Sequence, residues 1–580
     1  MMRALAWLLL IVAPLAAGPH LRVAVVQMTL GPSLEANRDR IVNWIPKAAA
    51  RGARAIVFPE GALSVRSNAP EGDVPGAVSL IRETARANKV YVLFGGWTWS
   101  ERHGKATNWM KVIGPGGAEL LHYDKLWDVH DARTPELFYL DGIPASAIIC
   151  ADRWLRGLED LPVQRGARIS FELSNNFASE WVPDLEWYWY APRALRNSVY
   201  VVFANTGNRT PGKPEPGVDQ RPRHGHSAVV APDGTLVSAA RDDLEALFVA
   251  DLDIARATRA EALARRSNPV LGKFWQAGLD LLDGKLKAPP PLARKDSAAA
   301  EITLAAAQIR ASADVARNVA AMVEKIGEAA RRNADLVAFP ELAVTGGKLS
   351  VVGDAVERLR AAARANRIAV AFGMPRREDG RWYNSAVIAG PGGEILTRYD
   401  QLAARPPFSP GERPAAMWFS VRGVPAVVTI GREALWNEIA ELAAVAGARV
   451  YVGLSREPVR GGAEALRRRQ IGAVLSSFMM FTVMANAGGY SAVWDDLNAR
   501  EETRAEVRDL PRPSPGAVRV FSAFSANLVV EAAAAPTLIW ATRRVSGGNP
   551  HYPQRTGNYH PAMAPWYEFG ARILTGVPDK

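Results

Sequence analysis

The chain has 580 residues, of which 48% are hydrophobic and 22% are charged, so it is an ordinary globular protein that is too long for a single core. Its formal net charge of +11 comes from arginines spread along the chain. No basic cluster is interleaved with aromatic side chains, which argues against a nucleic-acid partner. The chain has one cysteine, Cys150, and so cannot form an internal disulfide.

The N-terminus has the pattern of a signal peptide. Arg3 precedes an apolar run over residues 4–13, and small residues follow up to Gly18. The run is too short to serve comfortably as a membrane span. We therefore expect residues 1–18 to be removed on export to the periplasm or out of the cell, with an uncleaved anchor as the alternative. No later stretch is apolar enough to cross a bilayer, so no integral span is expected after cleavage.

Strand and helix patterns alternate along the first half. We expect a strand over residues 21–28, a helix over residues 34–51 and a second strand over residues 55–58. Further strands are expected at the apolar runs of residues 145–149 and 200–204. Because these runs are apolar almost without interruption, the strands should be buried on both faces, in sheets covered by helices.

The second half of the chain repeats the first. The Phe-Pro-Glu sequence that ends at Glu60 recurs at Glu341, and Gln27 recurs at the same offset as Gln308. The turn sequence Gly-Pro-Gly-Gly also occurs once in each half. These matches indicate a tandem duplication.

The repeat divides the chain into two α/β domains. We place the first domain at residues 22–286 and the second at residues 301–580. Residues 287–300 between them are rich in proline, alanine and charged side chains, as expected of a linker.

The sequence around Cys150 predicts a strand, a sharp turn and a helix over residues 153–164. That geometry lifts the side chain out of the sheet edge. The positive end of the following helix would favour the thiolate, which is the form that attacks electrophiles. The alternative is a buried cysteine that acts as a small hydrophobic residue.

Three motifs of the first half follow one another in a recognisable order. Glu60 lies in Phe-Pro-Glu-Gly, Lys125 in Tyr-Asp-Lys-Leu and Cys150 in Ile-Cys-Ala-Asp. This order resembles the carbon–nitrogen hydrolase, or nitrilase, superfamily. The resemblance implies a four-layer α-β-β-α sandwich for each half and a Glu-Lys-Cys triad. It also implies a second supporting glutamate, for which Glu136 is the residue placed to match.

The chemistry of amide cleavage requires these residue types independently of any family. A thiolate at Cys150 attacks the amide carbon and forms a thioester, while the carboxylate of Glu60 takes the thiol proton and returns it to the leaving amine. Lys125 and the backbone N–H of Ala151 would stabilise the oxyanion. Glu136 would hold Lys125 in place.

The residues that follow the nucleophile indicate which reactions of the family are expected. Resemblance to family members with Cys-x-Asp points to amidases and carbamoyl-amide hydrolases that cleave non-peptide C–N bonds. The residues expected to contact a small amide substrate are Ala151, Asp152, Trp154, Ser174, Asn175 and Asn176.

Two other functions stay open. The stretch from Leu173 to Phe177, with Arg193-Ala194 and Asn205-Thr206-Gly207 beyond it, also resembles bacterial apolipoprotein N-acyltransferases, which share the fold but carry a membrane domain of several spans. The first alternative is therefore N-acyl transfer, and the second is binding of an amide or acyl ligand without turnover. The identity of the substrate cannot be read from the sequence.

The second half keeps the scaffold and loses the reagents. Glu341 remains, but Gln401 stands at the position of Lys125 and Gly431 at that of Cys150. This half is predicted to be inactive. Family members commonly dimerise next to the cysteine, so we expect the two halves to pair as an intrachain pseudo-dimer, and further association of whole chains is left open.

No cofactor or metal is expected. His224 and His226 would lie on one face of a strand, but no third ligand is evident. No glycine-rich phosphate loop is visible in the sequence.

Overall fold

The computed structural model describes residues 19–64, 73–101, 103–129, 136–208, 221–292, 300–478, 480–495, 512–513, 527–533, 537–545 and 560–577. The predicted signal peptide and half of the predicted linker, residues 293–299, lie outside these residues. Within the described ranges, no helix has the length and apolar character needed to cross a bilayer.

The first half contains two sheets. The strands of the first sheet are β1 (His20–Gln27), β2 (Ala55–Val57), β3 (Leu63–Ser64), β4 (Tyr91–Ser100), β5 (Lys105–Ile113), β6 (Glu119–Asp124) and β13 (Ala246–Asp253), in the order β13-β1-β2-β4-β5-β6 with β3 beside β4. The strands of the second sheet are β7 (Phe138–Leu140), β8 (Ile143–Ile149), β9 (Ile169–Ser174), β10 (Tyr200–Asn205), β11 (Ala228–Val230) and β12 (Leu236–Ala239), in the order β12-β11-β10-β9-β8-β7.

Helices cover the outer face of each sheet. The helices of the first half are α1 (Leu34–Ala50), α2 (Val74–Asn88), α3 (Arg156–Arg165), α4 (Ala191–Asn197), α5 (Ala260–Ser267) and α6 (Leu271–Leu282). Along β1, Val23 and Val25 join the core between the sheets, whereas Ala24 and Val26 join the core beneath α1 and α2. Both faces of the strand are therefore buried, which explains its uninterrupted apolar sequence.

The second half repeats this plan. Its first sheet contains β14 (Ala300–Gln308), β15 (Leu336–Ala338), β16 (Ala369–Glu378), β17 (Arg381–Ala389), β18 (Ile395–Asp400), β24 (Arg512–Pro513) and β26 (Thr537–Val545). Its second sheet contains β19 (Trp418–Val421), β20 (Val424–Ile430), β21 (Val450–Pro458), β22 (Phe481–Gly488), β23 (Ser491–Asp495) and β25 (Asn527–Ala532). The helices are α7 (Val315–Arg331), α8 (Ala355–Asn366), α9 (Glu438–Ala446), α10 (Gly462–Ser476) and α11 (Ala564–Thr575). The predicted tandem of α-β-β-α sandwiches is confirmed.

The repeated glutamines have the same structural role in both halves. The side-chain carbonyl of Gln27 accepts the N–H of Ser227 at 2.9 Å, and that of Gln308 accepts the N–H of Ser491 at 3.0 Å. Each bond joins the first strand of one sheet to the other sheet of the same half.

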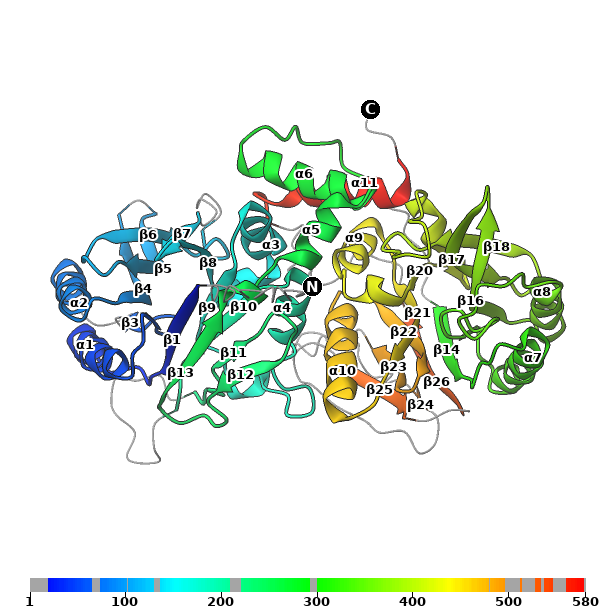
Figure 1. The fold of residues 1–580 in the computed structure, drawn as a ribbon, viewed down its shortest axis with the longest axis horizontal. Coiled ribbons are helices and arrows are strands. Elements are labelled where there is room, and N and C mark those ends of the chain that lie inside the picture. Colours follow the sequence, from blue (N-terminus) through cyan, green and yellow to red (C-terminus); the bar gives the residue numbers. More distant parts are fainter. Residues whose placement is uncertain are drawn as a thin grey trace, which may run out of the picture.

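The two halves pack through their inner helices. Figure 1 shows α1 and α2 at one end of the molecule and α7 and α8 at the other, with α3, α4, α9 and α10 between the sheets and α6 beside α11 above them. The rings of Phe274 and Trp566 stack with centroids 4.4 Å apart. Gly278 lies under Trp566, and Gly570 lies under Phe274. These reciprocal contacts make the chain an intrachain pseudo-dimer.

Candidate active site

The candidate residues gather where strand ends of the two sheets meet. Glu60 follows β2, Cys150 follows β8 and Asn176 follows β9. Strands β8 and β9 are parallel, so their carboxyl ends lie at one edge. The N–H of Glu60 donates to the carbonyl of Ser174 at 3.3 Å, which joins the first sheet to that edge.

Glu60 and Lys125 form a buried ion pair. The Lys125 ammonium donates to Glu60 Oε1 at 2.7 Å, and Asn108 Nδ2 donates to the same oxygen at 2.5 Å. Burial opposes the charge of Glu60, but Lys125, Asn108 and Cys150 together hold its pKa below the usual value. Burial likewise opposes the charge of Lys125, and Glu60 overcomes it and raises its pKa. Both groups are therefore charged at neutral pH.

Cys150 occupies a strained turn. Its φ of 45° lies in the left-handed region, and it starts a short 3-10 helix (Cys150–Trp154) that precedes α3. The helix expected over residues 153–164 is present as α3, but it begins at Arg156 because the 3-10 helix ends at Trp154 and Leu155 separates the two. Strain of this kind in a residue other than glycine is common at functional sites.

The expectation of an activated thiolate is wrong for the free protein. Burial and the carboxylate of Glu60 raise the pKa of the Cys150 thiol to about 12, against the opposing effects of Arg153 and Lys125. A 3-10 helix of five residues offers little dipole to offset this. The nucleophile therefore rests as a thiol.

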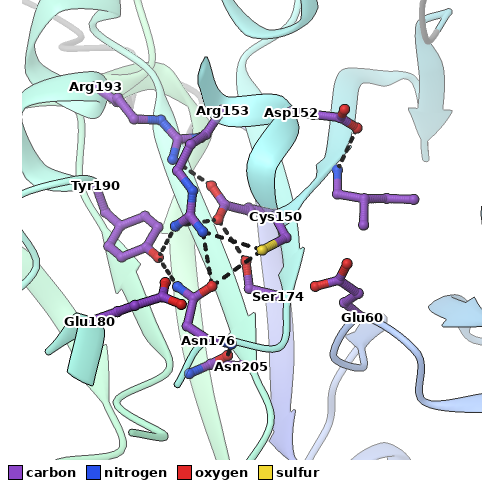
Figure 2. Close-up of polar contacts among 12 residues, drawn as sticks. Glu60, Cys150, Asp152, Arg153, Ser174, Asn176, Glu180, Tyr190, Arg193 and Asn205 are labelled. Carbon is purple, nitrogen blue, oxygen red and sulfur yellow. Dashed lines mark hydrogen bonds and ion pairs between the residues drawn. The ribbon is translucent and has the colours of Figure 1, made fainter. Parts of the chain in front are cut away.

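Arg153 contacts the sulfur directly and was not predicted. Figure 2 shows its guanidinium on the side of the thiol opposite Glu60. Arg153 Nη2 lies 3.3 Å from Cys150 Sγ and donates to Asn176 Oδ1 at 2.8 Å, while Nη1 donates to the Tyr190 hydroxyl at 2.8 Å. Its place three residues after the cysteine is the only sequence signal for this role, and it does not reveal the direction of the side chain.

Asn108 was also missed as a site residue, although the repeat offered a signal. It is buried on β5 and recurs as Asn384 in the second half. A buried polar side chain that survives in both copies of a duplicated fold has a hydrogen-bonding role. In the first half, that role is to fix Glu60.

Asp152 is a structural residue, which corrects its predicted contact with substrate. It is fully buried and accepts the Tyr123 hydroxyl at 2.8 Å and the N–H groups of Trp127 at 2.9 Å and Ile149 at 3.3 Å. Burial raises its pKa to about 7. Asp152 thus joins the turn at Cys150 to the segment that carries Lys125.

The other residues predicted to bind substrate are placed differently from one another. Ser174 is buried and its hydroxyl donates to Glu172 Oε1 at 2.7 Å, so it too is structural. Trp154 packs edge-on against Trp189 and lines a cavity of about 40 Å³ at the junction of the two halves. Neither side chain is placed to recognise an amide.

Three of the predicted substrate contacts remain candidates. Asn176 Oδ1 accepts a hydrogen bond from Cys150 Sγ at 3.2 Å. Asn175 is half-buried and accepts Arg223 Nε at 2.5 Å. Ala151 lies in the first turn of the 3-10 helix, where N–H groups have no acceptor within the helix, so its N–H is available to an oxyanion.

Glu136 does not support Lys125, which corrects the role expected for it. Glu136 is exposed, and the acids that act on Lys125 are Glu60, Asp128 and Asp152. Asp128 is half-buried, and burial together with Glu60 raises its pKa against the opposing effect of Lys125. Among the described residues, Asp128 is therefore the better candidate for the second carboxyl group of the site.

An aromatic wall with two neutral histidines adjoins the site. Trp181 stacks on His226 with centroids 3.8 Å apart and on His224 at 5.5 Å. Burial, His226 and Arg153 lower the pKa of His224 to about 3. In the part of the chain that the structure describes, no group of three or more His, Cys, Asp or Glu side chains could hold a metal ion.

Glu180 places a further negative charge near the thiol. It is half-buried, and Figure 2 shows it beside Asn176, on the side of Cys150 away from Glu60. Its charge contributes to the raised pKa values of both Cys150 and Arg153. A substrate that approaches the thiol from this side would therefore meet a carboxylate.

A model of one protein family matches both halves. The family is described as carbon-nitrogen hydrolase, and the match covers residues 22–262 and 303–495. Hydrolase Rv0480c of Mycobacterium tuberculosis is 28% identical over 257 residues, which cover 40% of this chain and 90% of the relative.

Amidases are found among both the relatives and the solved structures. The omega-amidase NIT2 of Homo sapiens is 27% identical over 305 residues, which cover 46% of this chain and 99% of the relative. A variant of the amidase from Nesterenkonia sp. AN1 in complex with butyramide is 21% identical with a TM-score of 0.36, covering 42% of this chain and 96% of that one.

Proposed function

The chain belongs to the carbon–nitrogen hydrolase family, and we propose that its first half hydrolyses a linear amide through a thioester on Cys150. The observation that carries this proposal is the position of Glu60, which accepts a hydrogen bond from Lys125 at 2.7 Å and, as Figure 2 shows, lies on the side of the Cys150 thiol opposite Arg153. One buried carboxylate is thus paired with a fixed cation and lies close enough to the nucleophile to raise its pKa.

The first step joins proton transfer to attack. The thiol of Cys150 is protonated at rest, so Glu60 takes its proton as the sulfur bonds to the amide carbon. The carbonyl oxygen becomes an oxyanion, which the Lys125 ammonium and the N–H of Ala151 stabilise. Glu60 then gives the proton to the amide nitrogen, the C–N bond breaks and the amine leaves.

The second step returns the enzyme to its resting state. Water attacks the thioester carbon while Glu60 takes one of its protons. The C–S bond breaks, the carboxylic acid leaves and the proton returns to sulfur. Lys125 takes no part in these proton transfers, and Asp128 and Asp152 help to keep it charged while Glu60 carries the proton.

The proposal has two further parts. The second half is inactive, which is supported by Gln401 and Gly431 at the positions of Lys125 and Cys150. The protein is exported, which is supported by the apolar run and small residues of the N-terminus. Amidase activity itself is supported by the similarity to omega-amidase NIT2.

The test is release of ammonia from a panel of short aliphatic amides, amino-acid amides and N-carbamoyl amino acids by the purified protein. We expect turnover of at least one of them and complete loss in Cys150→Ala, with an unchanged circular dichroism spectrum. A Cys150→Ala protein with full activity would disprove the assignment of the nucleophile.

Hydrolysis, acyl transfer and simple binding give different products in this assay. A hydrolase releases the free acid in water alone, whereas a transferase needs an added amine and forms the N-acyl product. A binding protein releases neither product. Measuring the free acid without hydroxylamine and the hydroxamate with it therefore separates the three functions, because a hydrolase gives the acid in water alone, a transferase gives only the hydroxamate and a binding protein gives neither.

A further inference from the structure

Arg153 is held by more than its contacts with the site. Besides Cys150, Asn176 and Tyr190, its guanidinium lies 3.1 Å from Glu172 Oε1, and its side chain is only 5% exposed. Glu172 is fully buried on β9. The orientation of Arg153, and therefore the cation against the sulfur, depends on this carboxylate.

Glu172 is one member of a chain of buried ion pairs within the first half. Glu172 also pairs with Arg193 at 2.5 Å, and Arg193 pairs with Glu159 at 2.6 Å. Arg196 lies 3.0 Å from Glu159 and 3.3 Å from Asp160. Positive and negative groups therefore alternate from β9 to α3, and each carboxylate in the series lies between two arginines.

The second half completes this chain. Arg156 pairs with Asp160 at 2.9 Å and with Glu441 of α9 at 2.5 Å. Arg265 lies 3.5 Å from Asp160 and 3.3 Å from Glu438, which is also on α9. The side chains of Arg265 and Glu438 are fully buried. The series thus runs without a break from α9 of the second half to the nucleophile of the first.

Arginines outnumber carboxyl groups among the ion pairs that this series forms within the first half. These pairs join five arginines to three carboxyl groups, those of Glu159, Asp160 and Glu172. Glu438 and Glu441 add two carboxyl groups from the second half, and burial raises the pKa of Glu441 to about 7 against the effect of Arg156. A buried charge without a partner is strongly unfavourable, so the pairs with α9 stabilise this arrangement.

Among its described residues, the second half has no such series of its own. Ala434 stands at the position of Arg153, and Gly453 stands at that of Glu172. The acids of α9 therefore have no local nucleophile to serve. Within the described part of the chain, the ion-pair partners of these acids, Arg156 and Arg265, both belong to the first half.

We propose that Glu441 and Glu438 of the second half are positioning residues for Cys150. They fix the arrangement of the buried ion pairs that keep the Arg153 guanidinium in contact with the sulfur. This rests on the proposed role of Cys150 as the nucleophile. Under this proposal, the half that lacks the catalytic lysine and cysteine contributes directly to the reaction of the other half.

The alternation of charges explains how a change in α9 reaches the site. Without the charge of Glu441, Arg156 draws Asp160 toward itself and away from Arg196. Each following arginine then pairs more closely with the next carboxylate: Arg196 with Glu159, and Arg193 with Glu172. Arg153 then loses its anchor and turns from the sulfur, which leaves the thiolate without its nearest cation.

The test is a double-mutant cycle read by alkylation of the full-length mature protein. Cys150 is the only cysteine, so its reaction with iodoacetamide between pH 6 and 9 reports on this site alone. We expect Glu441→Gln to lower the rate constant by about threefold or more, and Arg153→Gln to lower it further. In the Arg153→Gln background, the effect of Glu441→Gln should disappear.

Glu261→Gln is the matched control. Glu261 also joins the halves, through Arg405 at 2.7 Å and through Arg432, and neither of these arginines belongs to the series above. It should leave the alkylation rate unchanged. If Glu441→Gln does not fold, Glu441→Asp replaces it, because aspartate keeps the carboxyl group on a shorter side chain. This variant should also slow alkylation only when Arg153 is present.

Two results would overturn the inference. One is an equal fold-change for the Glu441 variant with and without Arg153, which a purely structural role predicts. The other is an alkylation rate that the Glu441 variant does not change. Because alkylation needs no substrate, a protein that cleaves none of the amides would disprove the proposed function and leave this cycle intact.

Discussion

The two halves share the geometry of the site and differ in its reagents. Asn108 donates to Glu60 at 2.5 Å, and Asn384 donates to Glu341 at 2.6 Å. The residue after the strand is left-handed in both halves, with φ of 45° at Cys150 and 53° at Gly431. The acid, its amide partner and the turn therefore belong to the scaffold.

The amide of Gln401 does not replace the ammonium of Lys125. Its Nε2 donates to the carbonyl of Ile430 at 2.8 Å, and its Oε1 accepts from Asn384 at 3.0 Å. Glu341 is left without a cation at this position, and burial raises its pKa to about 7. The same buried carboxyl group is charged beside Lys125 and only partly ionised at neutral pH beside Gln401.

The contrast shows which part of the fold carries chemistry. A buried acid at a strand end is compatible with an inactive domain, since Glu341 survives there. Only the nearby cation makes that acid a base at neutral pH. Exchanging single residues between the halves tests this view directly.

Lys125→Gln, which copies the second half, should have the largest effect. It removes the oxyanion cation and lets the pKa of Glu60 rise, so kcat should fall by about 100-fold or more with little change in fold. Steady-state amide hydrolysis measures this. The control is Gln401→Lys, which should leave kcat unchanged because the second half has no nucleophile. A Lys125→Gln enzyme that keeps most of its activity would contradict the assigned role.

The sequence predicted the scaffold and the order of the reagents. Glu60, Lys125 and Cys150 lie in short motifs at strand ends, and the repeat identified the fold twice over. Local sequence patterns suffice to predict these features, because a strand end positions its side chains in much the same way regardless of how distant parts of the chain pack. The loss of Lys125 and Cys150 from the second half was equally visible.

The remaining features depend on tertiary packing. Asp152 and Glu136 are both acids near motifs, but only the fold makes the first fully buried and the second exposed. The raised pKa of Cys150 follows from burial and from Glu60, which is distant in sequence. The direction of Arg153 is set by Glu172, and its anchoring runs into the other half, which no local pattern encodes.

The reciprocal glycines give a second comparison. A Cβ at Gly278 would lie 2.7 Å from the Trp566 ring, and one at Gly570 would lie 2.6 Å from Phe274. Gly278→Ala and Gly570→Ala should therefore each destabilise the paired halves by about 1–3 kcal/mol. Gly462→Ala in α10, where a Cβ meets nothing within 4 Å, is the control. If only one of the two variants melts at a lower temperature than the control, the two glycine contacts do not contribute equally to the pairing of the halves.

Glu341→Gln should change the dependence of stability on pH. The folded pKa of Glu341, about 7, lies above its ordinary value of 4.5, so its contribution to stability is full below pH 4.5 and is lost as pH rises through 7. The amide does not titrate. We expect the variant to match the parent at pH 5 and to exceed it by about 2 kcal/mol at pH 8 in melting experiments.

Glu60→Gln is the matched variant in the first half, and its effect has the opposite sign. The pKa of Glu60 is lowered, so its charge contributes stability above its ordinary pKa, which is lost as pH falls. At pH 8, Glu60→Gln should therefore destabilise where Glu341→Gln stabilises. Shifts of the same sign would mean that Lys125 does not distinguish the two carboxyl groups.

The smallest expected effect lies in the turn that both halves keep. A left-handed conformation costs a residue other than glycine about 1–2 kcal/mol, and part of the relief on changing to glycine is offset by the freedom that glycine gains in the unfolded chain. Cys150→Gly should therefore be more stable than Cys150→Ala by about 0.5–1 kcal/mol, although both are inactive. Denaturation of the two variants measures the difference. Equal stability would indicate that the turn at Cys150 relaxes when the thiol is removed, and that the left-handed turn at Gly431 is not a property of the shared scaffold.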